Sequence, residues 1–101
     1  MRIYIVGTVM SVSEQTMVKL PKGPEIPKAT IAVRTRDEAT DAYIAIDAFG
    51  EEKIQRLTEA QVSGLPVEMV VTISSRIWTN DDGKTGYSTF LNLKHLLGTM
   101  K

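Results

Sequence analysis

Residues 44–62, IAIDAFGEEKIQRLTEAQV, change from a strand pattern to a helix pattern at Gly50. Before Gly50, apolar residues stand at positions 44, 46 and 48, the alternation typical of a strand with one buried side. After it, apolar residues stand at 54, 57 and 62, and acidic residues fill the first turn, where the helix dipole favours them. We therefore expect a strand over 41–49 and a helix over 51–62, with no other helix in the chain.

Two stretches before this one also alternate. Residues 2–12 predict a long first strand, and Gly7 inside it suits a sharp bend such as barrel strands make when they cross from one side of a sheet to the other. Residues 29–36 predict a second strand with Ile31 and Val33 facing inward. A polar turn joins this second strand to the third, so the two form a hairpin.

Two further strands follow the helix. Residues 67–78 alternate through Val67, Met69 and Val71, and residues 87–97 are again rich in apolar side chains. The segment 80–86 between them, NDDGKTG, has the composition of a hairpin turn. Three strands, a helix and two strands are the order of an all-β fold, the five-stranded OB-fold barrel with one helix between strands 3 and 4.

The segment 13–28 contains Pro21, Pro24 and Pro27, which argue against a central strand or an unbroken helix. We expect a long loop there. Loops of this length are uncommon in compact domains and are often functional. Its lysines, Lys19 among them, outnumber its acids.

Composition limits the classes of function. A chain of 101 residues with 43% hydrophobic residues suits a single domain, 1–101, with one core. No apolar run approaches the roughly 20 residues of a membrane-spanning helix, and the first residues enter a strand pattern directly, so we expect a cytoplasmic protein. The absence of cysteine excludes disulfides, zinc ribbons and thiol nucleophiles. Twelve basic residues balance twelve acidic ones, so attraction to a polyanion depends on how charge is arranged.

Two stretches resemble bacterial single-stranded-DNA-binding proteins and the related primosomal replication protein. One is IDAFGEE at 46–52, a strand that ends in Phe-Gly before the helix. The other is RIWTNDDG at 76–83, followed by Lys84 and Tyr87, which is similar to that family's fourth strand and the hairpin after it. The resemblance extends over the whole chain, but its specificity depends on the Arg-x-Trp-Thr motif.

The resemblance implies a non-enzymatic protein that binds single-stranded DNA during replication or recombination. Trp78 would stack on a base and Arg76 would meet a phosphate, in a homodimer or homotetramer that works with other replication proteins. Two features depart from the family: Gly86 stands where a basic residue is frequent, and the chain stops at Met100-Lys101 without the family's linker and acidic tip. The missing tail favours a tail-less accessory, phage, plasmid or primosome-type member.

Binding of unpaired DNA requires aromatic faces for bases and cations along the backbone. The strand pattern places Arg34, Arg36 and Tyr43 on the outer side of one hairpin, and the resemblance brings residues of the 76–87 hairpin beside them in one groove. The predicted nucleic-acid-binding residues are Lys19, Lys22, Arg34, Arg36, Tyr43, Arg76, Trp78, Lys84 and Tyr87. A base stacked on Trp78 or Tyr43 is worth about 1–3 kcal/mol, more than one exposed cation.

Structural interpretations of the same residues remain open. A lone tryptophan in a small β domain is usually a packing residue, so Trp78 would then cap the barrel. Tyr43 and Tyr87 would be partly buried strand residues, and Arg34 and Arg36 a solvated strand face. The lysines of 13–28 would then only favour solubility.

Alternative functions also remain. We expect no catalytic site, because His95 has no nucleophile or carboxylate in a motif with it. The sequence NDDG resembles part of a calcium loop but lacks the downstream glutamate, so we expect a turn, with no metal and no cofactor. An OB-type adaptor that contacts only proteins would use the same hairpins as its interface. An RNA or tRNA binder is a further alternative.

Overall fold

The structure is a computed structural model that describes residues 1–37 and 40–99, without the side chains of residues 36, 37, 40, 41 and 99. Its elements follow one another as β1 (Arg2–Val12), β2 (Thr16–Lys19), β3 (Glu25–Asp37), β4 (Thr40–Phe49), α1 (Glu51–Ser63), β5 (Val67–Thr79) and β6 (Thr85–Thr99). The predicted strand-to-helix change at Gly50 is confirmed, since Gly50 is the N-cap of α1.

The strands close into a barrel. They are ordered β1-β5-β6-β4-β3, and β1 also pairs with β3, which joins the two ends of the sheet. All neighbours are antiparallel except β4 and β6, which meet in parallel at the pair Asp47 and Asn92. With α1 between β4 and β5, this is the OB fold, as predicted. β2 lies outside the five-stranded barrel and pairs with the first residues of β3, Glu25 to Lys28.

Gly7 marks the point where β1 changes partner. Residues up to Gly7 pair with β5, and from Thr8 onward the strand pairs with β3. The barrel is so tight at this point that a Cβ on residue 7 would lie 2.5 Å from Cγ1 of Val33 and 2.7 Å from the carbonyl oxygen of Arg34. The predicted crossing of β1 from one side of the sheet to the other at Gly7 is therefore confirmed as a change of partner, and only glycine fits there without a shift of β3.

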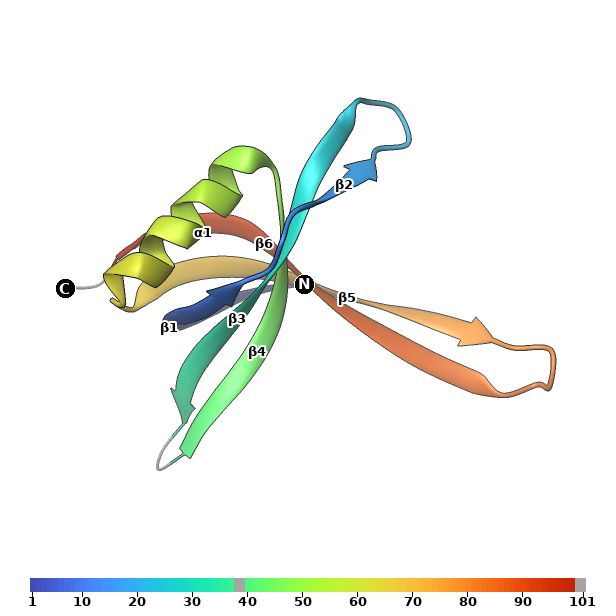
Figure 1. The fold of residues 1–101 in the computed structure, drawn as a ribbon. Helices are drawn as coiled ribbons and strands as arrows, with labels where there is room; N and C mark the ends of the chain where they lie inside the picture. The colour runs from blue at the N-terminus through green and yellow to red at the C-terminus, as the bar shows by residue number, and fades with distance from the viewer. Residues whose placement is uncertain (38–39, 100–101) are drawn as a thin grey trace.

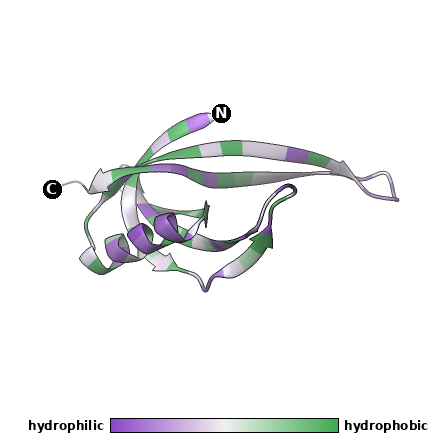
Figure 2. Cartoon of the chain, turned by 90° about the horizontal axis from the view of Figure 1, so that it is seen from above, coloured by the Kyte–Doolittle hydropathy of each residue, from purple (hydrophilic) through white to green (hydrophobic). Residues whose placement is uncertain are grey.

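The core lies between the barrel strands and α1. Ile31, Val33 and Ile46 are fully buried inside the barrel, as their alternation predicts. One side of α1, made of Ile54, Leu57 and Ala60, closes the barrel. The side of the helix that faces solvent is hydrophilic (Figure 2). The acidic first turn of the helix thus faces away from the core.

The expected loop over 13–28 is wrong. Thr16–Lys19 forms β2 and pairs with the first residues of β3, which begins at Glu25 and not at Ala29. The prolines do not prevent this hairpin, because Pro21 and Pro24 lie between its two strands and Pro27 lies just beyond the end of the β3–β4 pairing. The carbonyl of Pro27 accepts a hydrogen bond from the N–H of Gly50 at 2.9 Å.

Three hairpins extend from the barrel in different directions (Figure 1). They are formed by β2 with β3, by β3 with β4, and by β5 with β6. The β5–β6 hairpin reaches farthest from the barrel in this view. These hairpins carry all the predicted binding residues, so their geometry decides which of those residues can act together.

Candidate nucleic-acid interface

The outer part of the β5–β6 hairpin, formed by residues 74–79 and 85–90, is called the arm here. Directly opposed residues of an antiparallel pair lie on the same face, and neighbours along a strand lie on opposite faces. The face we call the Trp78 face contains Ser74, Arg76, Trp78, Gly86, Ser88 and Phe90. The opposite face, called the Tyr87 face, contains Ser75, Ile77, Thr79, Thr85, Tyr87 and Thr89.

Trp78 is held in a fixed orientation on its face of the arm. Gly86 lies opposite it, and the six-membered ring of the indole covers the place where a Cβ of residue 86 would stand. The indole Nε1–H donates a hydrogen bond to Oγ of Ser88 at 3.3 Å. Trp78 is still 45% exposed, so the ring is supported on one side and open to solvent on the other. The alternative that Trp78 caps the barrel does not fit this position on the arm.

Arg76 lies on the same face as Trp78, opposite Ser88 and two cross-strand pairs nearer the barrel. Phe90 lies two pairs farther along, opposite Ser74 on this face, and its side chain is also exposed. The Trp78 face thus carries an exposed aromatic ring at each end and a guanidinium between them. Phe90 was missed as a candidate, although Leu91 and Leu93 turn inward and simple alternation places Phe90 on the other face.

The tip of the arm is a turn organised by Asn80. Its Oδ1 accepts hydrogen bonds from the backbone N–H groups of Asp82, at 3.1 Å, and Lys84, at 2.9 Å. Gly83 adopts a positive φ of 79°, which favours glycine. The turn predicted for NDDG is confirmed. Lys84 is exposed at this tip next to Asp81 and Asp82 in sequence, so the charge of the tip is mixed.

Tyr87 lies on the face opposite Trp78, because it pairs with Ile77. It is 72% exposed, so it is not the partly buried strand residue of the structural alternative. The arrangement separates it from Arg76 and Trp78, with which the predicted groove grouped it. One strand of nucleic acid reaches Trp78 and Tyr87 together only by passing around the edge of the arm.

Arg34 and Tyr43 are opposite each other on the outer side of β3 and β4, and Thr8 of β1 continues the row. Tyr43 is exposed and Arg34 is half-buried. The structure therefore brings this cation and this aromatic ring together, as the strand pattern predicts. The side chain of Arg36 lies outside the described residues.

Lys19 and Lys22 lie on the β2–β3 hairpin. Lys19 is opposite Glu25, and Lys22 lies between the two strands, with both lysine side chains exposed. The predicted residues are thus distributed over three hairpins that point in different directions (Figure 1). The structure groups Arg76 with Trp78, and Arg34 with Tyr43, and keeps the lysines of the β2–β3 hairpin apart from both.

A carboxylate that the sequence did not single out lies on the outer side of β4. Asp47 Oδ1 accepts a hydrogen bond from the Thr30 hydroxyl at 2.7 Å, and its Oδ2 lies 3.6 Å from Lys28 Nζ. The same ammonium lies 5.8 Å from the ring centroid of Phe49. Lys28 therefore offsets the negative charge of Asp47 near the point where β4 meets β6.

Tyr4 lies exposed on the outer side of β1. A side-chain hydrogen bond to Glu68, which also repels the phenolate, raises the pKa of Tyr4 above its ordinary value of 10.0. The phenol thus keeps its proton to a higher pH than an ordinary tyrosine.

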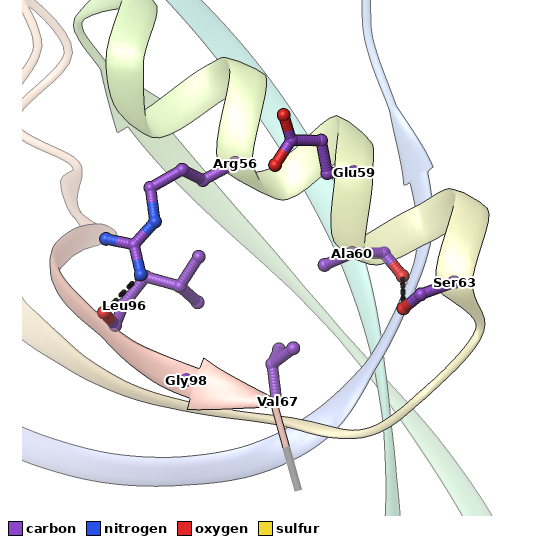
Figure 3. A pocket seen from close by; sticks show the side chains of 7 residues that line it. All are labelled: Arg56, Glu59, Ala60, Ser63, Val67, Leu96 and Gly98. Carbon is purple, nitrogen blue, oxygen red and sulfur yellow. Dashed lines mark hydrogen bonds between the residues drawn. The ribbon is translucent and has the colours of Figure 1, made fainter.

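A cavity of about 330 Å³ lies between α1 and the end of β6 (Figure 3). It is lined by Arg56, Glu59, Ala60, Ser63, Val67, Leu96 and Gly98. Arg56 Nη2 donates a hydrogen bond to the Leu96 carbonyl at 3.2 Å. The helix thus supplies a hydrogen-bond donor to this carbonyl of β6. None of the predicted binding residues lines this cavity.

Other classes of site are absent from the described residues in two respects. Over residues 1–37 and 40–99, no helix has the length and apolar character needed to cross a membrane. In the same part of the chain, no group of His, Asp and Glu side chains has the arrangement of a metal site. His95 is exposed on β6 opposite Val70.

No protein-family model matches the chain, and no curated protein matches it. Solved structures do. One crystal form of the mitochondrial single-stranded DNA binding protein from S. cerevisiae has a TM-score of 0.64 at 22% identity, covering 99% of this chain and 97% of that chain. A second form has a TM-score of 0.54 at 23% identity, with 99% and 98% covered. A Plasmodium falciparum SSB complex with ssDNA has a TM-score of 0.48 at 16% identity, with 91% and 84% covered. The yeast structures agree with the OB fold described above.

Proposed function

We propose that this protein binds single-stranded DNA, in the cytoplasm, without catalysis or cofactor, and serves replication or recombination. The observation that carries the proposal is the indole of Trp78, which is held by Gly86 and Ser88 and is still 45% exposed to solvent. A base stacks on an aromatic face with a gain of about 1–3 kcal/mol, whatever its identity. Because Gly86 and Ser88 already hold the ring, little side-chain entropy remains to be lost on stacking.

Arg76 supports the proposal by its position beside Trp78. Its guanidinium suits a phosphate of the strand whose base stacks on the indole, and Phe90 offers a second ring on the same face. This assignment keeps the roles that the resemblance implies for Trp78 and Arg76 and adds Phe90. Arg34 and Tyr43 form a second candidate contact on the β3–β4 hairpin.

Charge distribution explains how a chain without net charge attracts DNA. Glu51, Glu52 and Glu59 lie on α1, which packs on the barrel and not on the arm. Asp47 is offset by Lys28. The acids that oppose binding on the arm are Asp81 and Asp82 at its tip, so we expect modest affinity per subunit and an assembly that places several copies on one strand.

The likeness of IDAFGEE and RIWTNDDG to bacterial single-stranded-DNA-binding proteins supports the same conclusion, as does the fold shared with the yeast mitochondrial protein, whose name states that it binds single-stranded DNA. We propose that the chain is a relative of the bacterial family, acting as a homodimer or homotetramer beside other replication proteins.

Fluorescence anisotropy with matched oligomers tests this function. Labelled single-stranded DNA, double-stranded DNA and RNA of one sequence are titrated with the protein at two salt concentrations. We expect single-stranded DNA to bind best and to lose affinity as salt rises, because ion release drives part of the binding. Tighter binding of RNA would favour the RNA alternative. No binding to any oligomer at low salt would contradict the proposal and favour the protein adaptor.

A further inference from the structure

A groove runs between α1 and the last residues of β6. It consists of two hollows that meet at Arg56 and Leu96, since both residues line each hollow. The larger hollow is the cavity of about 330 Å³ drawn in Figure 3, and it extends to Gly98. The smaller one, of about 170 Å³, is lined by Glu52, Lys53, Arg56, Lys94, His95 and Leu96. The two hollows together are called the α1–β6 groove.

Two β-bulges in β6 shape this groove. The register of β6 against β5 skips Lys94 and Leu97, so β6 has one extra residue at each place. Carbonyls three residues apart on a regular strand point to opposite edges, yet the carbonyls of Leu93 and Leu96 both accept hydrogen bonds from α1. The extra residue Lys94 lies between them and accounts for this. The bulged backbone of β6 is therefore turned toward the helix.

These carbonyls hold two cations of α1 over the groove. Lys53 Nζ lies 3.5 Å from the Leu93 oxygen, and Arg56 Nη2 lies 3.2 Å from the Leu96 oxygen. Figure 3 shows the Arg56 side chain reaching from the helix to β6. Each cation uses one N–H in this way, so its remaining N–H groups stay available for another acceptor. Because the side chains are already restrained, they lose less entropy when a ligand binds.

The smaller hollow is positively charged. Lys53, Arg56 and Lys94 surround it, against the single acid Glu52. Both lysines are half-buried. Within residues 1–37 and 40–99, none of these four side chains forms an ion pair. An excess of positive charge that is not offset by ion pairs favours an anionic group in this hollow.

The larger hollow has a different chemistry. The charges of Arg56 and Glu59 balance there, and the buried side chains of Ala60 and Val67 contribute apolar surface. Gly98 leaves the end of this hollow open, since no atom lies within 4 Å of the place where its Cβ would stand. The groove thus offers a site for a negative group beside a site for an apolar one.

The dimensions of the groove suit an extended peptide. Pockets for compact ligands measure about 300–1,000 Å³, and the positively charged hollow is smaller than that, so it suits a single side chain. Lys94 and Gly98, which each line one hollow, are separated by at most about 13 Å of extended strand. A peptide of about five residues spans this distance.

The lining of the groove does not suit a nucleic acid. Among the described residues that line it, none is a Phe, Tyr or Trp. The bases of a single strand would therefore lack the stacking surface that Trp78 provides on the arm. Charge and size together favour a carboxylate of a peptide over a phosphate of DNA.

We propose that the α1–β6 groove binds an extended acidic segment of a partner protein. A carboxylate of that segment occupies the smaller hollow and accepts charge-assisted hydrogen bonds from Lys53, Arg56 and Lys94. An apolar side chain of the same segment lies against Ala60 and Val67. The groove shares no residue with the Trp78 face, so the proposal does not depend on whether Trp78 stacks on bases.

Fluorescence anisotropy with a labelled peptide tests this proposal. The probe has three aspartates flanked by two leucines on each side, and its matched control has asparagine in place of aspartate. We expect saturable binding of the acidic peptide alone. The double variant Arg56→Gln/Lys94→Gln should weaken it at least about tenfold, because two charge-assisted hydrogen bonds are lost. Arg2→Gln/Lys22→Gln removes the same charge outside the groove and should leave the affinity for the peptide unchanged.

Three anisotropy results would overturn the proposal, provided that thermal melting shows each variant to be folded. One is no binding of the acidic peptide at low salt. Another is an equal loss of affinity in the two double variants, because net charge and not the groove would then be responsible. The third is displacement of the peptide by unlabelled oligo-dT, which would assign the groove to nucleic acid.

Amide chemical shifts give a second test on the wild-type chain, which does not depend on the folding of a variant. We expect the peptide to shift the signals of residues 52–63 on α1 and 93–98 on β6. Shifts confined to other parts of the chain, the arm included, would contradict the proposal. Titrations with oligo-dT are a separate measurement, so failure of DNA binding would leave this result standing.

Discussion

The indole of Trp78 lies over Gly86 on the neighbouring strand, in the space where any other residue would place its Cβ. This contact explains why glycine suits a position where the resembling family often has a basic residue. A side chain at 86 would displace the ring, and the Ser88 hydroxyl that now fixes Nε1 would lose its partner. Compared with members of that family that have a basic residue here, the chain has one cation fewer at this point. It has an oriented aromatic ring in its place.

Replacing Gly86 by alanine should weaken DNA binding without any change in charge. The new methyl group pushes the ring of Trp78 off its support, so we expect a loss of up to about 1–3 kcal/mol, the value of one stacked base. Anisotropy titrations with labelled oligo-dT measure the loss. Gly23→Ala is the control, because its Cβ would meet only Leu20, at 3.6 Å, in ordinary contact. Unchanged affinity in Gly86→Ala would show that the ring position is not used in binding.

Replacing Arg76 by glutamine should lower both the affinity and its dependence on salt. If Arg76 neutralises one phosphate, the slope of log K against log salt becomes shallower by about 0.7 for a single strand. Arg56→Gln on α1 serves as the comparison, since Arg56 donates to Leu96 far from the arm. Parallel slopes for wild type and Arg76→Gln would exclude a phosphate contact at this residue.

Replacing Gly7 by alanine should destabilise the barrel. The added methyl would lie 2.5 Å from Val33 Cγ1 and 2.7 Å from a backbone oxygen of β3, which cannot move as a side chain can. We expect a loss of about 1–3 kcal/mol, as for other overpacked cores. Urea unfolding followed by Trp78 fluorescence gives the value, again beside Gly23→Ala. A midpoint equal to that of the wild type would mean that β1 and β3 separate here at little cost.

Raising the pH should ionise Tyr4 later than an ordinary tyrosine. The folded pKa of Tyr4 is raised above 10.0, so the hydrogen bond is present below that value and its contribution to stability is lost as pH rises through the raised pKa. Glu68→Ala removes the cause, so part of the phenolate absorbance should develop at lower pH than in the wild type. Superimposable absorbance titrations would contradict the assigned contact.

The OB fold was predictable because its signals are local. Gly50 separates a two-residue period from a helical one, and Gly7 stands where β1 changes partner. The β2–β3 hairpin was missed because prolines were read as breaking the strand, whereas Pro27 lies where β3 has no β4 partner to receive an N–H. Proline excludes a residue from a ladder only where its N–H is needed.

The arrangement of the candidate site residues could be predicted from the sequence only in part. Trp78 and Arg76 lie on one face as expected, yet Tyr87 and Trp78 were grouped although their cross-strand partners, Ile77 and Gly86, place them on opposite faces. That assignment depends on the register of β5 against β6, and a shift of one residue would exchange the faces. The direction of each hairpin depends on barrel closure and has no local signal in the sequence.

The central claim is that Trp78 stacks on the bases of single-stranded DNA, and its own fluorescence tests this most directly, because it is the chain's only tryptophan. Oligo-dT is titrated into the protein at low and at high salt while the emission is recorded. We predict saturable quenching at low salt, with the midpoint moving to higher oligomer concentration as salt is added. Emission that stays constant while anisotropy reports bound oligomer would show that DNA binds elsewhere, and would contradict this account.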